Sequence, residues 1–490
     1  MFTTLSSLIV RDKDLPERAW RLEVLQAVRD GKIYDRLPYE FHDEQNGSGE
    51  YVPLRQRKPS VRYGLCKIVV RDVASLLFGE RRFPAIESPN QATQDTMAAM
   101  CDQNQLNRIM VGAALKGSIG SVAVRLRILR GRIFWDCLET AHLTPEWEPE
   151  APDTLLSVTE KYKVRGDALA ERGYSIANDE LRTMFWFQRV WDQQDEVWFY
   201  PWKVMRQPND RGPVRDAQRS VHHGLGFVPM VWITNLPGGD QVDGGCTFEP
   251  AIETSLEIDY QLSQAGRGLK YQSDPVLMIR EPAMSDERQM VRSASNALIV
   301  SEKGDAKMLE IGGTAATAVM DYVRGLRELA LESISGNRSN ADKISAAQSG
   351  RAMELLHQPL VWLADTLRPA YGESGLLRMA QMVVKASAIM PLIIQDETVR
   401  DLNGSKLSLR WGPWFTATHS DKQMLATTLA TLRTAGLISR ERGVEVADEI
   451  TEAPDAQAEL ALIAKDEQAS VALAAQMPTA QTKVTQPGAA

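Results

Sequence analysis

Histidine and cysteine are scarce in this chain, which has six of the first and four of the second among 490 residues. The cysteines, Cys66, Cys101, Cys137 and Cys246, are too widely scattered for a disulfide framework or a CxxC metal clamp. This usage predicts a reducing compartment. So few histidines also leave little material for acid–base catalysis near neutral pH.

Sequence patterns for metal, nucleotide or nucleophile chemistry are missing as well. His222 and His223 form an adjacent pair, but no third ligand lies at metal spacing and no HExxH occurs. Asp240, Asp243 and Glu249 offer carboxylates, though not in the order of an EF-hand loop. The chain has no GxxxxGK[ST] phosphate loop and no GxSxG elbow. We therefore predict neither an enzyme nor a cofactor, and assign the histidine pair to a loop.

Long apolar runs are absent from the sequence. The nearest candidate for a membrane span, Met379–Ile394, is interrupted by Lys385 and Pro391. The apolar start Met1–Val10 lacks the basic leader of a signal peptide. We expect a soluble chain made in a cytoplasm.

An excess of positive charge is missing too, because the formal net charge is -8 and the pI is about 5.5. This balance argues against a protein that wraps nucleic acid on a basic surface. It does not exclude a protein that acts on DNA without binding it tightly.

The patterns that are present predict an α+β protein. Leu15–Val28 and Val61–Phe78 have helical spacing of apolar residues. From residue 111 to 235 the period changes to that of strands, with a turn at Arg130–Gly131. The expected strands are Val122–Ile128, Ile133–Cys137, Leu155–Val164, Thr183–Val190 and Glu196–Val204.

Two helices are expected on either side of a small β module. Glu249–Tyr271 is the first helix and Thr314–Ser335 the second. Between them, Pro275–Arg280 and Ala297–Ser301 have the composition of short strands.

A polar loop, Gly336–Gly350, precedes a long helical pattern that starts at Ser349 and continues to about Met390. A helix of that length covers about 40 residues and about 60 Å. Pro359 and Pro369 each remove a helical hydrogen bond and are predicted to bend it.

The C-terminal part is again helical in pattern. After a short strand at Lys406–Leu409, helices are expected at Met424–Thr434 and Ser439–Ile450. The composition then falls to Ala, Gln, Thr and Pro, and we predict a disordered tail over residues 468–490.

The order of these elements resembles that of the portal, or head-to-tail connector, proteins of tailed double-stranded DNA phages, in the branch of long-tailed phages. The resemblance covers residues 60 to 467, and Cys246 or Thr247 departs from it, since a serine is more usual near the start of the first helix. Three sequence strings carry the resemblance, and the first is His223–Asn235, followed by Phe248–Pro250 and the helix up to Asp274–Pro275. The second is Ser349–Met353, which leads into Gln358–Leu360. The third extends from Leu407 through Trp411, Asp421, Leu432 and Gly436–Ser439 to Glu459.

The resemblance implies a homo-oligomeric ring, usually of twelve subunits, at one capsid vertex of the virion, assembled in the host cytoplasm. Double-stranded DNA would pass through its axis during packaging and ejection. The implied partners are the terminase, a head-completion or tail adaptor protein, and the major capsid and scaffolding proteins, with no membrane.

It also implies a division of the chain into the regions of a portal fold. These are the N-terminal part of the wing (1–248), a stem helix (249–274), the clip (275–312), a second stem helix (313–336), a tunnel loop (337–349), the long kinked helix and return strand of the wing (350–420), the crown (421–467) and the tail (468–490).

The tunnel loop supplies the residues that the resemblance places at the DNA channel. Among them Arg338 and Lys343 are hypothesised to touch the phosphate backbone transiently. An enzyme, or another ring-forming capsid-assembly scaffold that conducts no DNA, is the alternative. The channel residues implied are Asn337, Arg338, Asn340, Lys343, Ser345 and Gln348.

Overall fold

The structure, a computed structural model, describes residues 8–79, 82–205, 213–240, 242–273, 276–282, 300–309, 314–336, 355, 357–404, 406–414, 419–451 and 456–476. It has both helices and sheets, as the α+β prediction requires. The chain divides into two compact units. The first contains residues 1–338 and 358–412, and the second contains residues 339–357 and 413–490.

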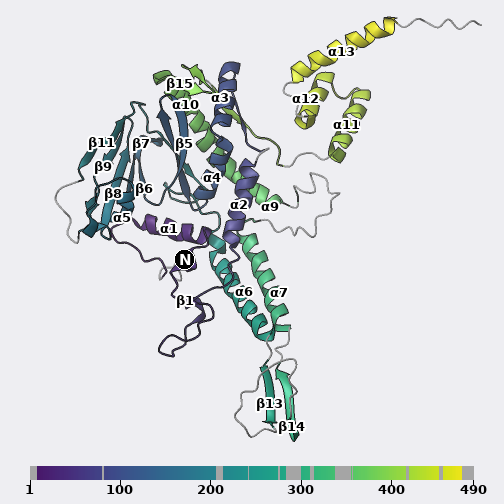
Figure 1. Cartoon of the computed structure of the whole chain (residues 1–490). Helices are drawn as coiled ribbons and strands as arrows, with labels where there is room; N and C mark the ends of the chain where they lie inside the picture. The colour runs from purple at the N-terminus through teal and green to yellow at the C-terminus, as the bar shows by residue number, and fades with distance from the viewer. Residues whose placement is uncertain are drawn as a thin grey trace, which may run out of the picture. The chain divides into compact units, whose positions relative to one another are not determined.

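The first sheet of unit 1 is built around the predicted hairpin (Figure 1). Its strands β4 (Ser121–Leu129) and β5 (Arg132–Glu139) pair antiparallel along their length. Arg130 and Gly131 both have positive φ, as a two-residue turn of this hand requires. The strand order is β12-β4-β5-β15-β16, completed by β12 (Met230–Thr234), β15 (Leu392–Ile394) and β16 (Glu397–Val399).

The second sheet has the strand order β11-β9-β8-β7-β6, and β10 pairs with β8 beside this path. It confirms the strands predicted at Leu155–Val164 and Thr183–Val190, whereas the single strand predicted at Glu196–Val204 is divided into β9 and β10. The bounds are β6 (Leu143–Glu148), β7 (Ala151–Arg165), β8 (Met184–Trp191), β9 (Asp195–Phe199), β10 (Trp202–Lys203) and β11 (Arg215–His222).

Helices of unit 1 pack on the first sheet and on one another. The predicted N-terminal helices are present as α1 (Glu17–Arg29) and α2 (Leu65–Phe78). The others are α3 (Gln91–Gln103), α4 (Leu106–Gly117) and the short α5 (Gly166–Glu171). Short 3₁₀ turns lie at Ile33–Arg36, Leu54–Gln56, Asn178–Glu180 and Glu249–Ala251, and short paired strands at β1 (Tyr39–Glu40), β2 (Arg57–Lys58), β3 (Ala85–Glu87) and β17 (Ser408–Arg410).

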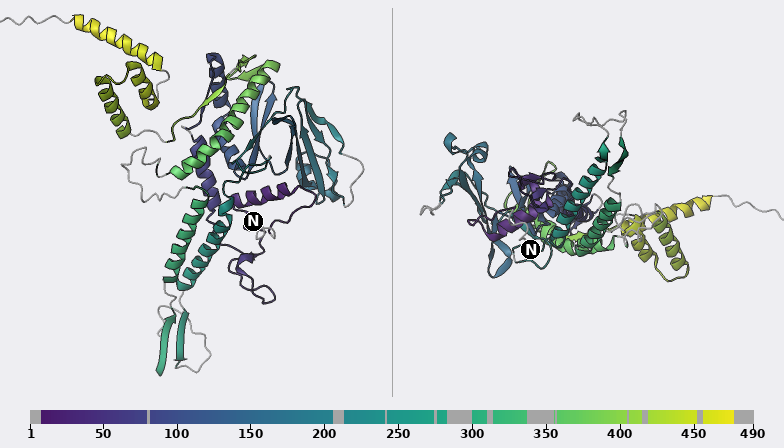
Figure 2. Two further views of the ribbon diagram at one scale, coloured as in Figure 1. Left: turned by 180° about the vertical axis from the view of Figure 1, so that it is seen from behind. Right: turned by 90° about the horizontal axis from the view of Figure 1, so that it is seen from below.

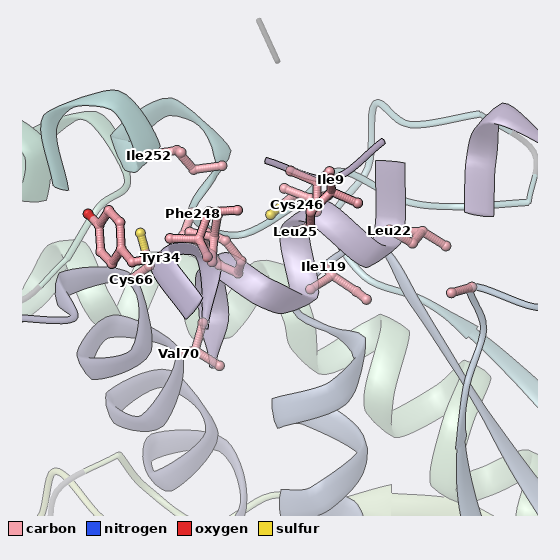
Figure 3. Close-up of a cluster of buried hydrophobic side chains, with 14 of the residues drawn as sticks. Ile9, Leu22, Leu25, Tyr34, Cys66, Val70, Ile119, Cys246, Phe248 and Ile252 are labelled. Carbon is pink, nitrogen blue, oxygen red and sulfur yellow. The ribbon is translucent and has the colours of Figure 1, made fainter. Parts of the chain in front are cut away.

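One hydrophobic core joins distant parts of the chain (Figure 3). Leu25 of α1, Cys66 of α2, Phe248 and Ile252 are all buried in it. All four cysteines are free, and burial raises the pKa of the Cys66 thiol to about 12. At physiological pH Cys66 is therefore a small apolar core residue.

The helix, β module and second helix are present in the predicted order. They are α6 (Ile252–Ser273), a hairpin of β13 (Val276–Pro282) and β14 (Val300–Leu309), and α7 (Thr314–Ser333). The second strand was predicted too early: it runs to Leu309, through a polar segment that lacks the apolar alternation used to find strands.

The long helical pattern continues through three segments with different winding. These are α9 (Gln358–Arg368), the π-helical segment η6 (Pro369–Leu377) and α10 (Arg378–Ile389). The change to π winding starts at Pro369, whereas Pro359 lies in the first turn of α9. Both bends remain predictions, and residues 349–354 lie outside the described residues.

Close packing explains where η6 lies. A Cβ on Gly375 would come within 2.9 Å of Ile233 in β12, and one on Gly372 within 2.7 Å of Trp411. Tyr371 and Leu376 are fully buried beside these glycines. The π-helical segment η6 therefore places glycines where neighbouring elements come close, and large side chains where those elements leave space.

Unit 2 contains the three C-terminal helices α11 (His419–Thr434), α12 (Arg440–Thr451) and α13 (Ala456–Gln476). Ser439 caps α12, because the Arg442 amide donates to Ser439 Oγ at 3.1 Å. The predicted tail boundary at residue 468 is wrong, since α13 continues to Gln476. Its alanines favour a helix, although their abundance also resembles low-complexity composition. Residues 477–490 lie outside the described residues.

Candidate functional site: the paired helices and their anchor

The six predicted channel residues lie outside the part of the chain that the structure describes. The candidate site is therefore built from the helices that precede and follow them. The residues concerned are Asn337, Arg338, Asn340, Lys343, Ser345 and Gln348.

The helices α6 and α7 pack side by side, as the views in Figures 1 and 2 agree. One face of α7 is buried, with Val323 and Ala330 two turns apart. On an adjacent face, about 100° around the helix, Tyr322 is 52% and Leu329 64% exposed. This helix thus has a second apolar stripe that nothing in the described residues covers.

Three glycines in these helices, Gly266, Gly268 and Gly325, are not required by any close contact with the described residues. A Cβ at any of them would meet no atom within 4 Å. Glycine in a helix interior costs about 0.5–1 kcal/mol relative to alanine. These positions leave strips of bare backbone surface that another molecule could approach closely.

The exposed side of α7 carries more negative than positive charge. Asp321, Glu328 and Glu332 lie on it, against Arg324, which pairs with Asp321 at 3.1 Å. Arg327 points elsewhere, because its Nε donates to the Tyr63 hydroxyl at 3.0 Å. An acidic helix surface of this kind repels phosphate groups.

A buried carboxylate anchors α6 to the N-terminal part of the chain. Asp259 is 4% exposed and accepts hydrogen bonds from the Tyr34 hydroxyl at 2.9 Å and the Tyr63 amide at 2.7 Å. Desolvation by burial raises the pKa of Asp259, and these donors oppose that rise. Burial also raises the pKa of Tyr34, so its hydroxyl stays protonated and can donate.

Two more residues of α6 hold the same extended segment. The Tyr260 hydroxyl lies 3.1 Å from the carbonyl oxygens of both Arg55 and Arg57. Ser263 Oγ accepts from the Val61 amide at 2.9 Å. The middle of α6 is therefore fixed to residues 55–63 by buried and half-buried polar contacts.

A second buried polar cluster fixes η6 to the first sheet. The Tyr371 hydroxyl donates to Asn235 Oδ1 at 2.9 Å, and Asn235 Nδ2 donates to Thr247 Oγ1 at 2.9 Å and to the Gly245 carbonyl at 2.8 Å. Burial raises the pKa of the Tyr371 phenol. Every polar atom of the Asn235 side chain is paired here, as a buried amide requires.

Replacing Tyr371 by phenylalanine is expected to lower the free energy of unfolding by about 1–2 kcal/mol, because the buried Asn235 Oδ1 loses its donor. Urea denaturation followed by circular dichroism measures it. Tyr322→Phe is the matched control: this tyrosine is 52% exposed, and its replacement should change stability by less than about 0.5 kcal/mol. Equal effects from both replacements would contradict the assignment.

The carboxylates weighed as metal ligands do not converge. Asp243 pairs with Arg18 and Glu249 lies 3.6 Å from Arg21, while Asp240 accepts from the Asp243 amide. Within the described residues no group of three His, Cys, Asp or Glu side chains could hold a metal ion.

The histidine pair has separate structural roles in the second sheet. His222 Nδ1 lies 2.6 Å from Asp195 Oδ1, and the Leu225 amide donates to His223 Nδ1 at 3.2 Å. Burial lowers the pKa of His223, which favours its neutral form. His222 is the last residue of β11 rather than part of a loop, as the sequence had predicted, and only His223 follows the strand.

Among the helices in the described ranges, none combines the length and apolar character needed to cross a bilayer. A scan against models of known protein families finds no match for this chain. A search of curated proteins likewise finds no relative.

Proposed function

We propose that this chain is a portal protein of tailed double-stranded DNA phages. In this role, copies of the chain form a ring at one capsid vertex, and DNA passes along the axis during packaging and ejection. The terminase docks on the ring first, and the head-completion or tail adaptor protein docks later.

The observation that carries the proposal is the unit formed by α6, the β13–β14 hairpin and α7. Two packed helices with a hairpin between them correspond in order to the stem and clip of the portal fold. The exposed Tyr322 and Leu329, with bare backbone at Gly325, suit contact with a neighbouring copy. In a ring, one surface must meet a different surface on the next copy, and the rotation must close.

The charge of the helices agrees with a passage for DNA. Each cationic contact with a phosphate adds affinity through counterion release, and a ring multiplies that contact by the number of copies. The excess of negative over positive charge on α7 would keep the ring from holding the DNA in place. The same proposal assigns the wing, crown and tunnel loop to the residue ranges given above. It includes no catalytic activity of the chain itself.

Electron microscopy of the purified full-length protein tests the proposal. We expect rings with an axial channel in negatively stained images, with no ATP turnover by the isolated protein. We expect rings because the exposed helix surfaces allow one copy to bind a different surface of the next copy. A compact monomer at micromolar concentration would refute the portal assignment, and ATP hydrolysis would favour the enzyme alternative.

A further inference from the structure

Helix α2 reaches solvent along one narrow stripe. Most of its side chains are buried, and the exposed ones lie within about 100° of one another around the helix. These are Lys67, Ile68, Arg71 and Ser75. Ile68 is 38% exposed, and Asp72, at the edge of the stripe, is half-buried. The stripe therefore presents two cations and one branched apolar side chain.

The two cations of this stripe have no partner among the described residues. Neither Lys67 nor Arg71 makes an ion pair there. They are four residues apart, so they are neighbours on the helix surface, and like charges at this spacing destabilise a helix. With Ile68 between them in sequence, they suit an acidic surface that has an exposed apolar side chain of its own.

The uncovered side of α7 repeats this pattern with the opposite charge. Glu328 and Glu332 are both exposed and four residues apart, and Glu328 makes no ion pair with a described residue. Leu329, which follows Glu328, is 64% exposed. Both helices therefore present the order charge, aliphatic side chain, charge over the same length of about 6 Å.

Within one chain the two stripes point away from each other. The chain just after α7 approaches α2 at Gly336, where a Cβ would lie 3.4 Å from Val69, and Arg327 of α7 contacts the segment before α2. Lys67 lies about 160° around α2 from Val69. Glu332 lies about 140° around α7 from Arg327. Contact between the two stripes therefore requires a second copy.

We propose that the exposed stripe of α2 binds the acidic stripe of α7 from a second copy of this chain. Charge complementarity and equal spacing select this occupant. In an antiparallel crossing each cation meets a carboxylate, with Lys67 against Glu332, and the two aliphatic side chains lie on the same side. In a parallel crossing those side chains would lie on opposite sides. DNA could offer phosphates to the cations but nothing apolar to Ile68.

This inference rests on the ring of the proposed function and names one contact within it. Because α2 and α7 are different surfaces, the contact is heterologous, as a closed ring requires. It also pairs Lys67 and Arg71 with carboxylates, so these cations do not hold DNA phosphates.

Charge reversal in the full-length protein tests the pairing. One variant combines Lys67→Glu with Arg71→Glu, and the other combines Glu328→Lys with Glu332→Lys. Either variant alone brings like charges together at every contact. The share of protein in rings, measured by size-exclusion chromatography and electron microscopy, should therefore fall at least about tenfold.

The control variant carries the same change in net charge at other places. It combines Arg108→Glu with Arg400→Glu, since both arginines are exposed and make no ion pair with a described residue. This variant should form rings as the wild type does. Circular dichroism shows whether each variant keeps its fold.

Mixing the two reversed variants separates a contact between copies from one within a chain. In an alternating ring the acidic α2 of one variant meets the basic α7 of the other, and the basic α2 meets the acidic α7, so the mixture should regain rings. Folded variants that form no rings on mixing, or a reversed variant that forms rings alone, would overturn the inference. If such rings no longer retain DNA when α2 is reversed, DNA is the occupant. If the wild-type protein forms no rings at all, the proposed function fails first.

Discussion

Replacing Arg18 by alanine is expected to lower the free energy of unfolding of unit 1 by about 3–5 kcal/mol, the usual cost of leaving a buried charge without its partner. The Arg18 guanidinium holds the Asp243 carboxylate through two bonds, at 2.5 Å from Nε and 2.8 Å from Nη2. The Asp243 side chain is 4% exposed. Ser121 Oγ also donates to it.

Arg18 has a second set of partners that its replacement also removes. Its Nη1 donates to the Thr140 carbonyl at 2.8 Å and to the Leu143 carbonyl at 2.7 Å. One side chain of α1 thus connects the end of the β4–β5 hairpin with the loop that contains Asp243. Without it, two carbonyls and one carboxylate lose donors in a largely buried place.

Urea denaturation with the tryptophan signal measures the change, and Arg21→Ala is the control. Arg21 lies one turn further along α1 and pairs with Glu249 at 3.6 Å, with 37% of its side chain exposed. An exposed pair of this kind contributes less than about 1 kcal/mol. If both replacements lower the free energy of unfolding by the same amount, the buried Arg18–Asp243 pair is not what stabilises this junction.

The second large effect is expected from Asp259→Ala. The Tyr34 hydroxyl and the Tyr63 amide lose their acceptor in a buried site, and each such loss costs about 1–3 kcal/mol, so we expect about 3 kcal/mol or more in total. Asp35→Ala is the control, because Asp35 is 51% exposed and pairs with Arg62 at 2.9 Å in the same neighbourhood.

The same replacement has a defined pH dependence. Because burial raises the pKa of Asp259 in the folded state above its ordinary value of 3.8, the folded protein holds this proton more tightly than the unfolded chain does. The resulting stabilisation is complete below the unfolded pKa and is lost as the pH rises through the folded pKa. The difference between wild type and Asp259→Ala should therefore be larger at pH 3.5 than at pH 7. A smaller difference at pH 3.5 would mean that the donors outweigh burial.

The elements that carry local signals could be predicted from sequence. The β4–β5 hairpin follows from alternation around Arg130–Gly131, and α2, α6 and α7 from apolar residues at helical spacing. Each of these depends on neighbours within a few residues in the chain. The β module between α6 and α7 was found because its flanking helices were clear, although its second strand was placed too early.

The buried polar contacts could not be predicted, because their partners are far apart in the chain. Tyr34 and Asp259 are separated by 225 residues, as are Arg18 and Asp243. One local signal existed for Asp259. It lies seven residues after Ile252 and four before Ser263, on the buried face of α6, and a carboxylate on such a face needs partners.

The π winding of η6 had only an indirect signal. Pro369 marked an irregularity, but the widening depends on how Gly372 and Gly375 approach Trp411 and Ile233, which are distant in sequence. The predicted boundary of the tail was wrong because it depended on composition alone, whereas the helix propensity of the alanines determines the structure there.

The contacts of α6 with residues 55–63 come from three different positions of one helix. Asp259, Tyr260 and Ser263 span about 6 Å along the helix axis, and each binds a different part of that segment. The loss of any one contact leaves the other two in place, so a single polar replacement weakens this junction without freeing α6 from the segment.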